Sequence, residues 1–488
     1  MRRAVLSIAV ASGAVIMGGV GLALVRASTM ESLQPDVDPT DEPVDEDRVA
    51  ELLGQALRFR TVSHHDESRA DPRPFEALNA WLPEAWPGMH ASPDIQVEAF
   101  GLSRLYTWEG TDPSLPPVML MAHTDVVPVE DASSWSRDPW SGAVEDGHVW
   151  GRGAIDMKAS MVGFMEATDA LGAEGFRPKR TVYLALGHDE EVGGHQGHEQ
   201  MAAALAQRGV RLGWVLDEGL VITDGIVPGL TAPAALIGTS EKGYLTVELL
   251  AEGLGGHSSM PPPQSAAGIV AGAAARLEAS PFPADVGGPV EQMFIWLAPE
   301  MDFVKRLAFA NLWLFGPVVQ GKLEARNNTN ATLRTTIAVT QLEGSVQENV
   351  LPQQARAVVN LRLHPRDSIE SALQHVEAAV DDPRVEVRPV EDSIHSEPSP
   401  VSSTQSDGWQ VITRSIREVH PEVIVAPGLM VGGTDSRWYV PVADDVYRFH
   451  PAWLGPVDTD RIHGTDERIS TRNLADYVRF YRRVLQAL

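Results

Sequence analysis

Histidines and carboxylates follow apolar runs in five segments of the sequence. These segments are PVMLMAHTDVVP (117–128), WGRGAIDMK (150–158), GHDEEVGG (187–194), WVLDEG (214–219) and RIHGTDERI (461–469). Because the chain has no cysteine, any borderline metal ion such as zinc must be held by His and carboxylate groups. One segment alone has a simpler explanation, such as a structural histidine or a charged turn. Together they supply enough ligands for two divalent ions bridged by a carboxylate.

The spacing within these segments suggests different tasks for neighbouring side chains. If the strand continues, His123 and Asp125 point to the same side, so the carboxylate can orient the imidazole toward a metal. Adjacent Glu190 and Glu191 repel each other, which a nearby cation or a bound proton would relieve. Their side chains diverge, so one can bind metal while the other faces a water. Asp156 precedes a helical pattern, where a helix N-cap is the competing interpretation.

The elements that must position these residues alternate between short apolar runs and helical patterns. The order is strand, helix, strand, helix, strand over 118–121, 158–171, 181–186, 200–207 and 214–216. This alternation predicts an α/β fold with a mainly parallel sheet flanked by helices. Functional side chains should then lie at the carboxyl ends of the strands.

The pattern changes after residue 239 and indicates a second domain. Strand-like and helical stretches follow over 242–251, 266–277, 331–340, 356–363 and 368–380. Two such strand-helix-strand sets predict an α+β lid domain over 241–390, inserted between catalytic parts at 48–240 and 391–488. The Pro- and Trp-rich stretch from Ser280 to Gly321 gives no clear assignment.

The N-terminus predicts export. Ala4 to Val25 carries no charge and is flanked by Arg2, Arg3 and Arg26. As a helix it would reach roughly 33 Å, enough to cross a bilayer core, and the flanking charges favour a body outside the cytoplasm. Residues 1–30 are therefore a membrane anchor or, alternatively, a cleaved signal peptide that leaves a secreted enzyme.

Composition narrows the remaining possibilities. Residues 31–47 are acidic and Pro-rich, which predicts an extended linker between the membrane and the body. The formal net charge of −27 argues against a nucleic-acid partner, because neutralising phosphates requires clustered Lys and Arg.

These motifs, in this order, resemble those of the M20 metallopeptidase family. GGHSS (255–259), ENVLPQQARAVVNLRLHP (348–365) and GGTDSR (432–437) add to the likeness, which covers about Asp47 to Leu488. Within the family, VNLRLHP and YRFHPAW resemble the branch of carboxypeptidase S and the N-acyl-amino-acid hydrolases/synthases.

The resemblance implies a site with two Zn²⁺ ions and specific residue roles. His123 and Asp217 would bind one zinc, Glu191 and His463 the other, with Asp156 bridging. Asp125 would orient His123, Glu190 would be the general base, and His257 of the lid would reach the scissile carbonyl oxygen. Asn349, Arg362 and Arg437 would contact the substrate.

The expected reaction is cleavage of an amide next to a free C-terminal carboxylate, on a short peptide or an N-acyl amino acid. Two alternatives stay open, a biosynthetic deacylase or desuccinylase and a non-catalytic, membrane-tethered metal-binding protein. The expected membrane contact is through the N-terminal helix only, and a homodimer through the lid is possible.

Overall fold

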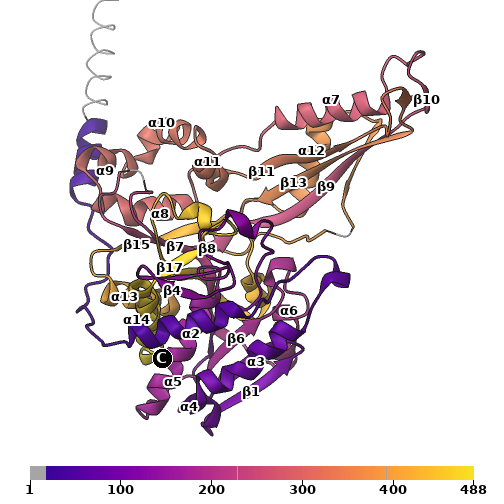
Figure 1. Cartoon of the computed structure of the whole chain (residues 1–488). Coiled ribbons are helices and arrows are strands. Elements are labelled where there is room, and N and C mark those ends of the chain that lie inside the picture. The colour runs from indigo at the N-terminus through magenta and orange to yellow at the C-terminus, as the bar shows by residue number, and fades with distance from the viewer. Residues whose placement is uncertain (1–17, 228, 392) are drawn as a thin grey trace, which may run out of the picture.

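An eight-stranded, mainly parallel sheet forms the centre of the molecule (Figure 1). The computed structural model describes residues 18–227, 229–391 and 393–488. From one edge to the other the strands are β1 (Ile95–Phe100), β2 (Ser103–Trp108), β6 (Val182–Gly187), β3 (Val118–His123), β7 (Leu212–Thr223), β16 (Ala443–Leu454), β8 (Ala234–Glu241) and β15 (Ile424–Met430). The predicted α/β fold with a mainly parallel sheet is confirmed.

Helices cover both faces of this sheet because its strands are apolar on both sides. In β3, Leu120 faces one hydrophobic core, whereas Met119 and Met121 face another. The first core is closed by α2 (Glu46–Arg58), α3 (Arg73–Ala85), α4 (Pro87–Ala91), α5 (Lys158–Ala173), α13 (Asp407–Val419) and α14 (Thr471–Gln486). The second is closed by α6 (His198–Gln207) and the 3₁₀ segment Asp435–Val442.

A four-stranded antiparallel sheet projects from the central sheet and has its own core (Figure 1). Its strands are, in order, β11 (Thr336–Glu343), β13 (Gln354–Leu363), β9 (Gly243–Glu252) and β14 (Val385–Pro389), and α7 (Ala266–Glu278) and α12 (Ile369–Val380) pack on it. We call these elements the lid. A two-stranded sheet of β10 (Gly256–His257) and β12 (Val350–Leu351) lies at the outer end of the lid.

Four helices connect α7 to β11, and the first three begin within the stretch 280–321 that the sequence left unassigned. They are α8 (Pro289–Leu297), α9 (Phe303–Phe309), α10 (Leu312–Glu324) and α11 (Asn327–Leu333). Trp296 and Met301 belong to the core of the large sheet, where Trp296 contacts Trp409 with ring centroids 5.0 Å apart. The α8 region therefore packs with the central sheet although its sequence lies within the range expected for the lid. The expected strand over 331–340 is partly wrong, because α11 continues to Leu333 and β11 begins at Thr336.

The remaining short elements are a small sheet and several 3₁₀ turns. β4 (Ala143–Glu145), β5 (His148–Trp150) and β17 (Arg468–Ser470) form a three-stranded sheet. Short 3₁₀ turns occur at Glu67–Arg69, Ala132–Ser134, Glu190–Val192, Ala298–Glu300 and Thr459–Arg461.

The segment before α2 is attached to the body. Gln34 exchanges two hydrogen bonds with the backbone of Val425 on the edge strand β15, at 2.9 and 2.7 Å. Glu42 forms an ion pair with Arg482 of α14. The range 31–47, expected to be a linker, thus runs along the protein because its polar side chains find partners there.

Much of the expected N-terminal span lies outside the described residues. The described part, residues 18–28, is helical. No helix among residues 18–227, 229–391 and 393–488 has the length and apolar character needed to cross a bilayer.

Candidate metal centre and active site

The carboxyl ends of three neighbouring parallel strands bring the predicted side chains together. β3 pairs in parallel with both β6 and β7, and His123 at the end of β3 lies opposite Gly187 at the end of β6. Glu190 and Glu191 follow in the turn after β6, and Glu218 lies on β7. A parallel arrangement places all of these groups at one edge of the sheet.

Asp156 lies between two groups of potential metal ligands. Its Oδ1 is 2.9 Å from His123 Nε2, and its Oδ2 is 3.0 Å from His463 Nε2. On the first side Glu218 Oε1 is 3.7 Å from His123 Nε2, and on the second Glu191 Oε1 is 3.3 Å from His463 Nε2. Within each group the ligand atoms lie within 4.8 Å of one another. Two cations sharing the Asp156 carboxylate fit this donor set.

Asp217, the expected ligand, does not join either group. Its buried carboxylate accepts a hydrogen bond from the Ser436 backbone N–H at 2.8 Å. β7 is irregular here, since its pairing with β16 skips Glu218 and Gly219. Glu218 Oε1 lies 3.7 Å from His123 Nε2, and the Asp217 carboxylate is not part of that group. The geometry brings Glu218 to the position that the sequence analysis gave to Asp217.

Negative charge dominates the centre. Burial raises the pKa of Glu190 well above its ordinary value, and the nearby carboxylates of Glu218 and Asp435 add to the effect. Burial and the Asp156 carboxylate do the same to the pKa of Glu218. Divalent cations would relieve this repulsion, since they would balance the carboxylates that now favour protons.

The pKa values of the two histidines are raised as well, because acidic groups surround them. Hydrogen bonds to Asp156 and Glu191 raise the pKa of His463 to about 10. Burial by itself would lower the pKa of His123, but the Glu218 carboxylate and further acidic partners raise it well above its usual value. In the metal-free protein both imidazoles therefore hold protons that a cation must displace.

Asp125 connects the β3 histidine to the turn after β6. Its Oδ1 lies 3.4 Å from His123 Nδ1, and its carboxylate accepts the backbone N–H groups of Glu190 and Glu191, both at 3.1 Å. Ser63 also donates to it at 2.7 Å. This buried carboxylate can orient the imidazole, as expected, and it also fixes the backbone that carries both glutamates.

Glu467 holds the Asp156 loop in the same manner and was not identified from the sequence. Its fully buried carboxylate accepts the backbone N–H groups of Gly153, Ile155 and Asp156 at 2.9, 2.8 and 3.1 Å. Arg152 pairs with it at 2.8 Å. Asp156 itself caps no helix, because α5 begins after Met157 and has no side-chain N-cap bond. Glu467 of RIHGTDERI thus positions the Asp156 carboxylate, which would bridge the two metal sites.

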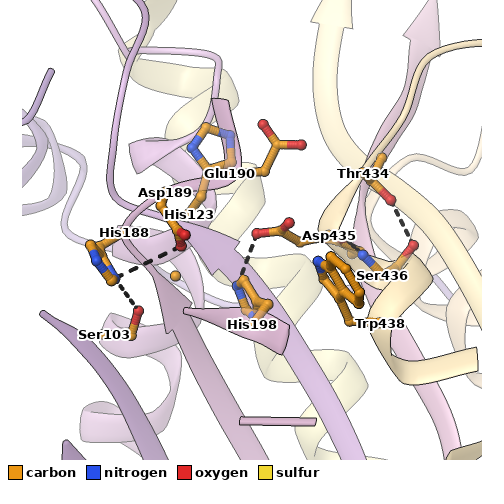
Figure 2. A network of polar contacts seen from close by, with 12 residues as sticks. Ser103, His123, His188, Asp189, Glu190, His198, Thr434, Asp435, Ser436 and Trp438 are labelled. Atoms are coloured by element: carbon orange, nitrogen blue, oxygen red, sulfur yellow. Dashed lines mark hydrogen bonds and ion pairs between the residues drawn. The ribbon is translucent and has the colours of Figure 1, made fainter. Parts of the chain in front are cut away.

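A second polar network supports the glutamate turn from the other side (Figure 2). His188 Nδ1 lies 2.6 Å from Ser103 Oγ, and Asp189 accepts the Gln196 backbone N–H at 2.6 Å. Asp435 lies 3.9 Å from His198 Nε2, and neither of its buried oxygens has a hydrogen-bond partner. Figure 2 shows Asp435 beside the turn and Glu190 beside His123.

The comparisons with known proteins agree with this arrangement. Residues 119–487 match the sequence profile of Peptidase family M20/M25/M40. The chain belongs to the M20 peptidase family. It is 40% identical to a zebrafish (Danio rerio) N-fatty-acyl-amino acid synthase/hydrolase, PM20D1.1, over 92% of this chain and 87% of that protein. It is 30% identical to carboxypeptidase S of Saccharomyces cerevisiae, over 86% of this chain and 80% of the relative.

Solved structures show the same fold. The M20 family metallo-carboxypeptidase from Sulfolobus solfataricus superposes with a TM-score of 0.64 at 16% identity, covering 91% of this chain and 99% of that one. Human carnosine dipeptidase 1 gives a TM-score of 0.57 at 16% identity, over 91% and 97% of the two chains. The chain is thus an M20 metallo-hydrolase, and the predicted family and enzyme class are confirmed.

Two of the expected substrate residues of this M20 enzyme lie near the root of the lid. Arg437 lines a cavity of about 670 Å³ that also touches Val192, the residue after Glu191. Its guanidinium donates to Gly193 O at 2.7 Å. Arg362 on β13 stacks over Tyr244, 4.3 Å from the ring centroid, and Tyr244 lines the same cavity.

The other two lie at the far end of the lid. β9 runs for ten residues from the root, a length of roughly 30 Å, and His257 follows its outer end. Asn349 lies beside it, since its carbonyl accepts the Ser258 N–H at 3.1 Å. His257 is exposed and, in this arrangement, stays apart from the metal groups (Figure 1).

Proposed function

We propose that the protein is a two-zinc amidase that cleaves the amide bond between an acyl group and an amino acid with a free carboxylate. N-acyl amino acids are the first candidate substrate, because the relatives of 36–40% identity are named N-fatty-acyl-amino acid synthases/hydrolases. The observation that carries the proposal is the Asp156 carboxylate shared by two ligand groups, with Glu190 close by.

The ligands we propose are His123, Glu218 and Asp156 for one zinc, and Asp156, Glu191 and His463 for the other. Glu218 replaces Asp217 in this assignment because Glu218 Oε1 lies 3.7 Å from His123 Nε2, whereas the Asp217 carboxylate accepts the Ser436 N–H. When bound, the two ions would polarise the scissile carbonyl and acidify the attacking water.

The protein's own groups then handle the proton and the substrate. Glu190, whose pKa is raised by burial and by the nearby carboxylates, would take a proton from the water and give it to the leaving amine nitrogen. Arg437, Arg362 or both would bind the substrate carboxylate from the lid-root cavity. His257 could stabilise charge on the carbonyl oxygen only after the lid moves or when a second copy supplies it.

For the whole chain we propose a catalytic unit formed by 48–240 and 391–488 with 241–390 inserted in it. Within this insert the lid elements form their own core, and the α8 region packs with the catalytic unit. The uncharged run Ala4–Val25 would export the enzyme, as a membrane anchor or as a cleaved signal peptide.

A carboxypeptidase acting on short peptides is the second candidate. The likeness to carboxypeptidase S and to the Sulfolobus metallo-carboxypeptidase favours it. Both candidate substrates carry a free carboxylate beside the amide. They differ in the group on the acyl side of that amide, which is a fatty acyl group in one and an aminoacyl group in the other.

The test is a substrate panel with the purified zinc-loaded enzyme. N-acyl amino acids, dipeptides and the carboxamide analogues of each are compared by kcat/KM, with Glu190→Gln as the inactive control. We expect turnover of free acids, little of carboxamides, and a preference for fatty-acyl over aminoacyl groups. Preference for dipeptides would select the second candidate, and equal turnover of acids and carboxamides would refute carboxylate recognition.

A further inference from the structure

Exposed apolar side chains concentrate on one part of the surface. Ten of the 21 large apolar side chains that the described residues leave exposed belong to helix 18–28 or to α8, α9 and α10. Among them are Val304 (75% exposed), Val318 (61%) and Trp313 (54%). The others are Val20, Leu22, Leu24, Val25, Ile295, Phe303 and Leu314. We call this the apolar surface.

The sequence beneath it is unusual for such an acidic chain. From Leu307 to Gly321 there is no charged residue, although the whole chain holds 66 acidic and 39 basic residues. The charges that border the run are basic, with Lys305 and Arg306 on one side and Lys322 on the other. A soluble protein seldom leaves so much contiguous apolar surface without a partner.

The apolar surface continues directly into the N-terminal run. Asn311, at the start of α10, is buried and donates from Nδ2 to the carbonyl of Ala23 at 3.0 Å. Ala23 and Ala27 are the buried side chains of helix 18–28, at 3% and 0% exposure, so its larger apolar side chains remain outside. Figure 1 shows this helix beside α9 and α10. The described end of the uncharged run, residues 18–25, therefore meets the body at this surface.

We propose that the apolar surface rests on a lipid bilayer, so that the body of the enzyme contacts the membrane in addition to the N-terminal run. An exposed Trp among aliphatic side chains with a basic border is typical of an interfacial surface, where the aliphatic groups enter the acyl region and the Lys and Arg groups meet anionic headgroups. A two-fold contact with a second copy explains the border less well, because it would bring basic residues against basic residues.

The absence of cysteine permits a direct test on the full chain. A fluorophore is attached at Val318→Cys on the apolar surface or, as the matched control, at Val346→Cys, 94% exposed on the loop between β11 and β12. Both proteins are reconstituted into phosphatidylcholine vesicles containing phosphatidylglycerol, with and without lipids that carry a quencher near the headgroup. We expect most of the fluorescence at position 318 to be quenched and its emission to shift to the blue, while position 346 is unaffected.

Unchanged activity and circular dichroism show that each labelled variant is folded. A further change, Lys322→Glu in the Val318→Cys protein, should reduce the quenching on anionic vesicles. Absence of quenching at position 318 would overturn the proposal. Energy transfer between labels at position 318 that rises with protein concentration, without lipid quenching, would assign the surface to a second copy instead.

Discussion

At the scale of single residues, the site depends on which of two neighbouring acids faces the histidine. The sequence WVLDEG places Asp217 and Glu218 next to each other, and either could bind metal. In the structure the Asp217 carboxylate accepts the Ser436 N–H, whereas Glu218 lies 3.7 Å from His123 Nε2. Periodicity predicts that the two side chains diverge, but the side that faces His123 is fixed only by the pairing of β7 with β3.

Replacing each acid by its amide separates the two roles. Glu218→Gln should reduce bound zinc from two ions toward one and abolish turnover, because a metal-binding carboxylate is lost. Asp217→Asn can still accept a hydrogen bond from Ser436, so it should retain both ions and lose only roughly 10- to 100-fold in activity, as for a supporting group. Elemental analysis with initial rates measures both effects. Loss of zinc in Asp217→Asn alone would restore the first assignment.

At the scale of elements, the turn after β6 has no room for a side chain at Gly194. Its φ is +68°, and an added Cβ would come within 1.9 Å of Asp435 Oδ1. The turn carries Glu190 and Glu191, so a shift there moves both glutamates. Gly175 is a matched control, because its φ is +78° and nothing lies within 4 Å of an added Cβ.

Gly175→Ala should therefore cost only the left-handed strain, roughly 1–2 kcal/mol of unfolding free energy. Gly194→Ala should cost more than this and should also lose most of its activity. Denaturant unfolding and kcat/KM measure the two effects. If Gly194→Ala loses no more stability than Gly175→Ala and keeps full activity, Asp435 moves aside to make room for the added methyl group.

The lid gives the second prediction at this scale. His257→Ala should lower kcat by roughly 10²–10³ with zinc content and folding intact, the usual effect of losing one donor to a developing oxyanion. Met260→Ala on the same tip, 79% exposed, is the control and should leave kcat unchanged. If kcat stays normal in His257→Ala, the lid tip does not take part in the reaction.

Elements with strong periodicity were predictable, and elements that depend on tertiary contacts were not. α12 spans Ile369–Val380 against an expected 368–380, because its buried Ala372, Val376 and Val380 recur every four residues. α8, α9 and α10 escaped assignment because Pro299, Gly316 and Pro317 interrupt the pattern. Glu467 was overlooked as a positioning group because nothing in the sequence shows that it accepts the N–H groups of the 153–156 loop.

At the scale of the whole molecule, the acidic centre couples metal binding to pH. The pKa of His463 is raised to about 10 in the metal-free protein, so this imidazole is protonated at pH 7 and must release its proton to bind zinc. The metal-free state then binds more protons than the zinc-bound state, so affinity should rise with pH, about tenfold per unit for each proton released.

Calorimetric zinc titrations between pH 6 and 8, in two buffers with different heats of ionisation, count the released protons. We expect at least one proton for each pair of ions. Affinity that does not change with pH would show that the histidines are already neutral before zinc binds.

The bond between Glu467 and the Asp156 loop also determines when the enzyme can first act. Asp156, near the end of the first third of the chain, is held by a residue that lies only 21 positions before the C-terminus, and His463 comes from the same late segment. A ribosome that has made most of the protein has therefore not yet made a functional centre. Metal loading must follow synthesis of the segment that carries His463 and Glu467, so products that terminate before this segment lack a functional centre.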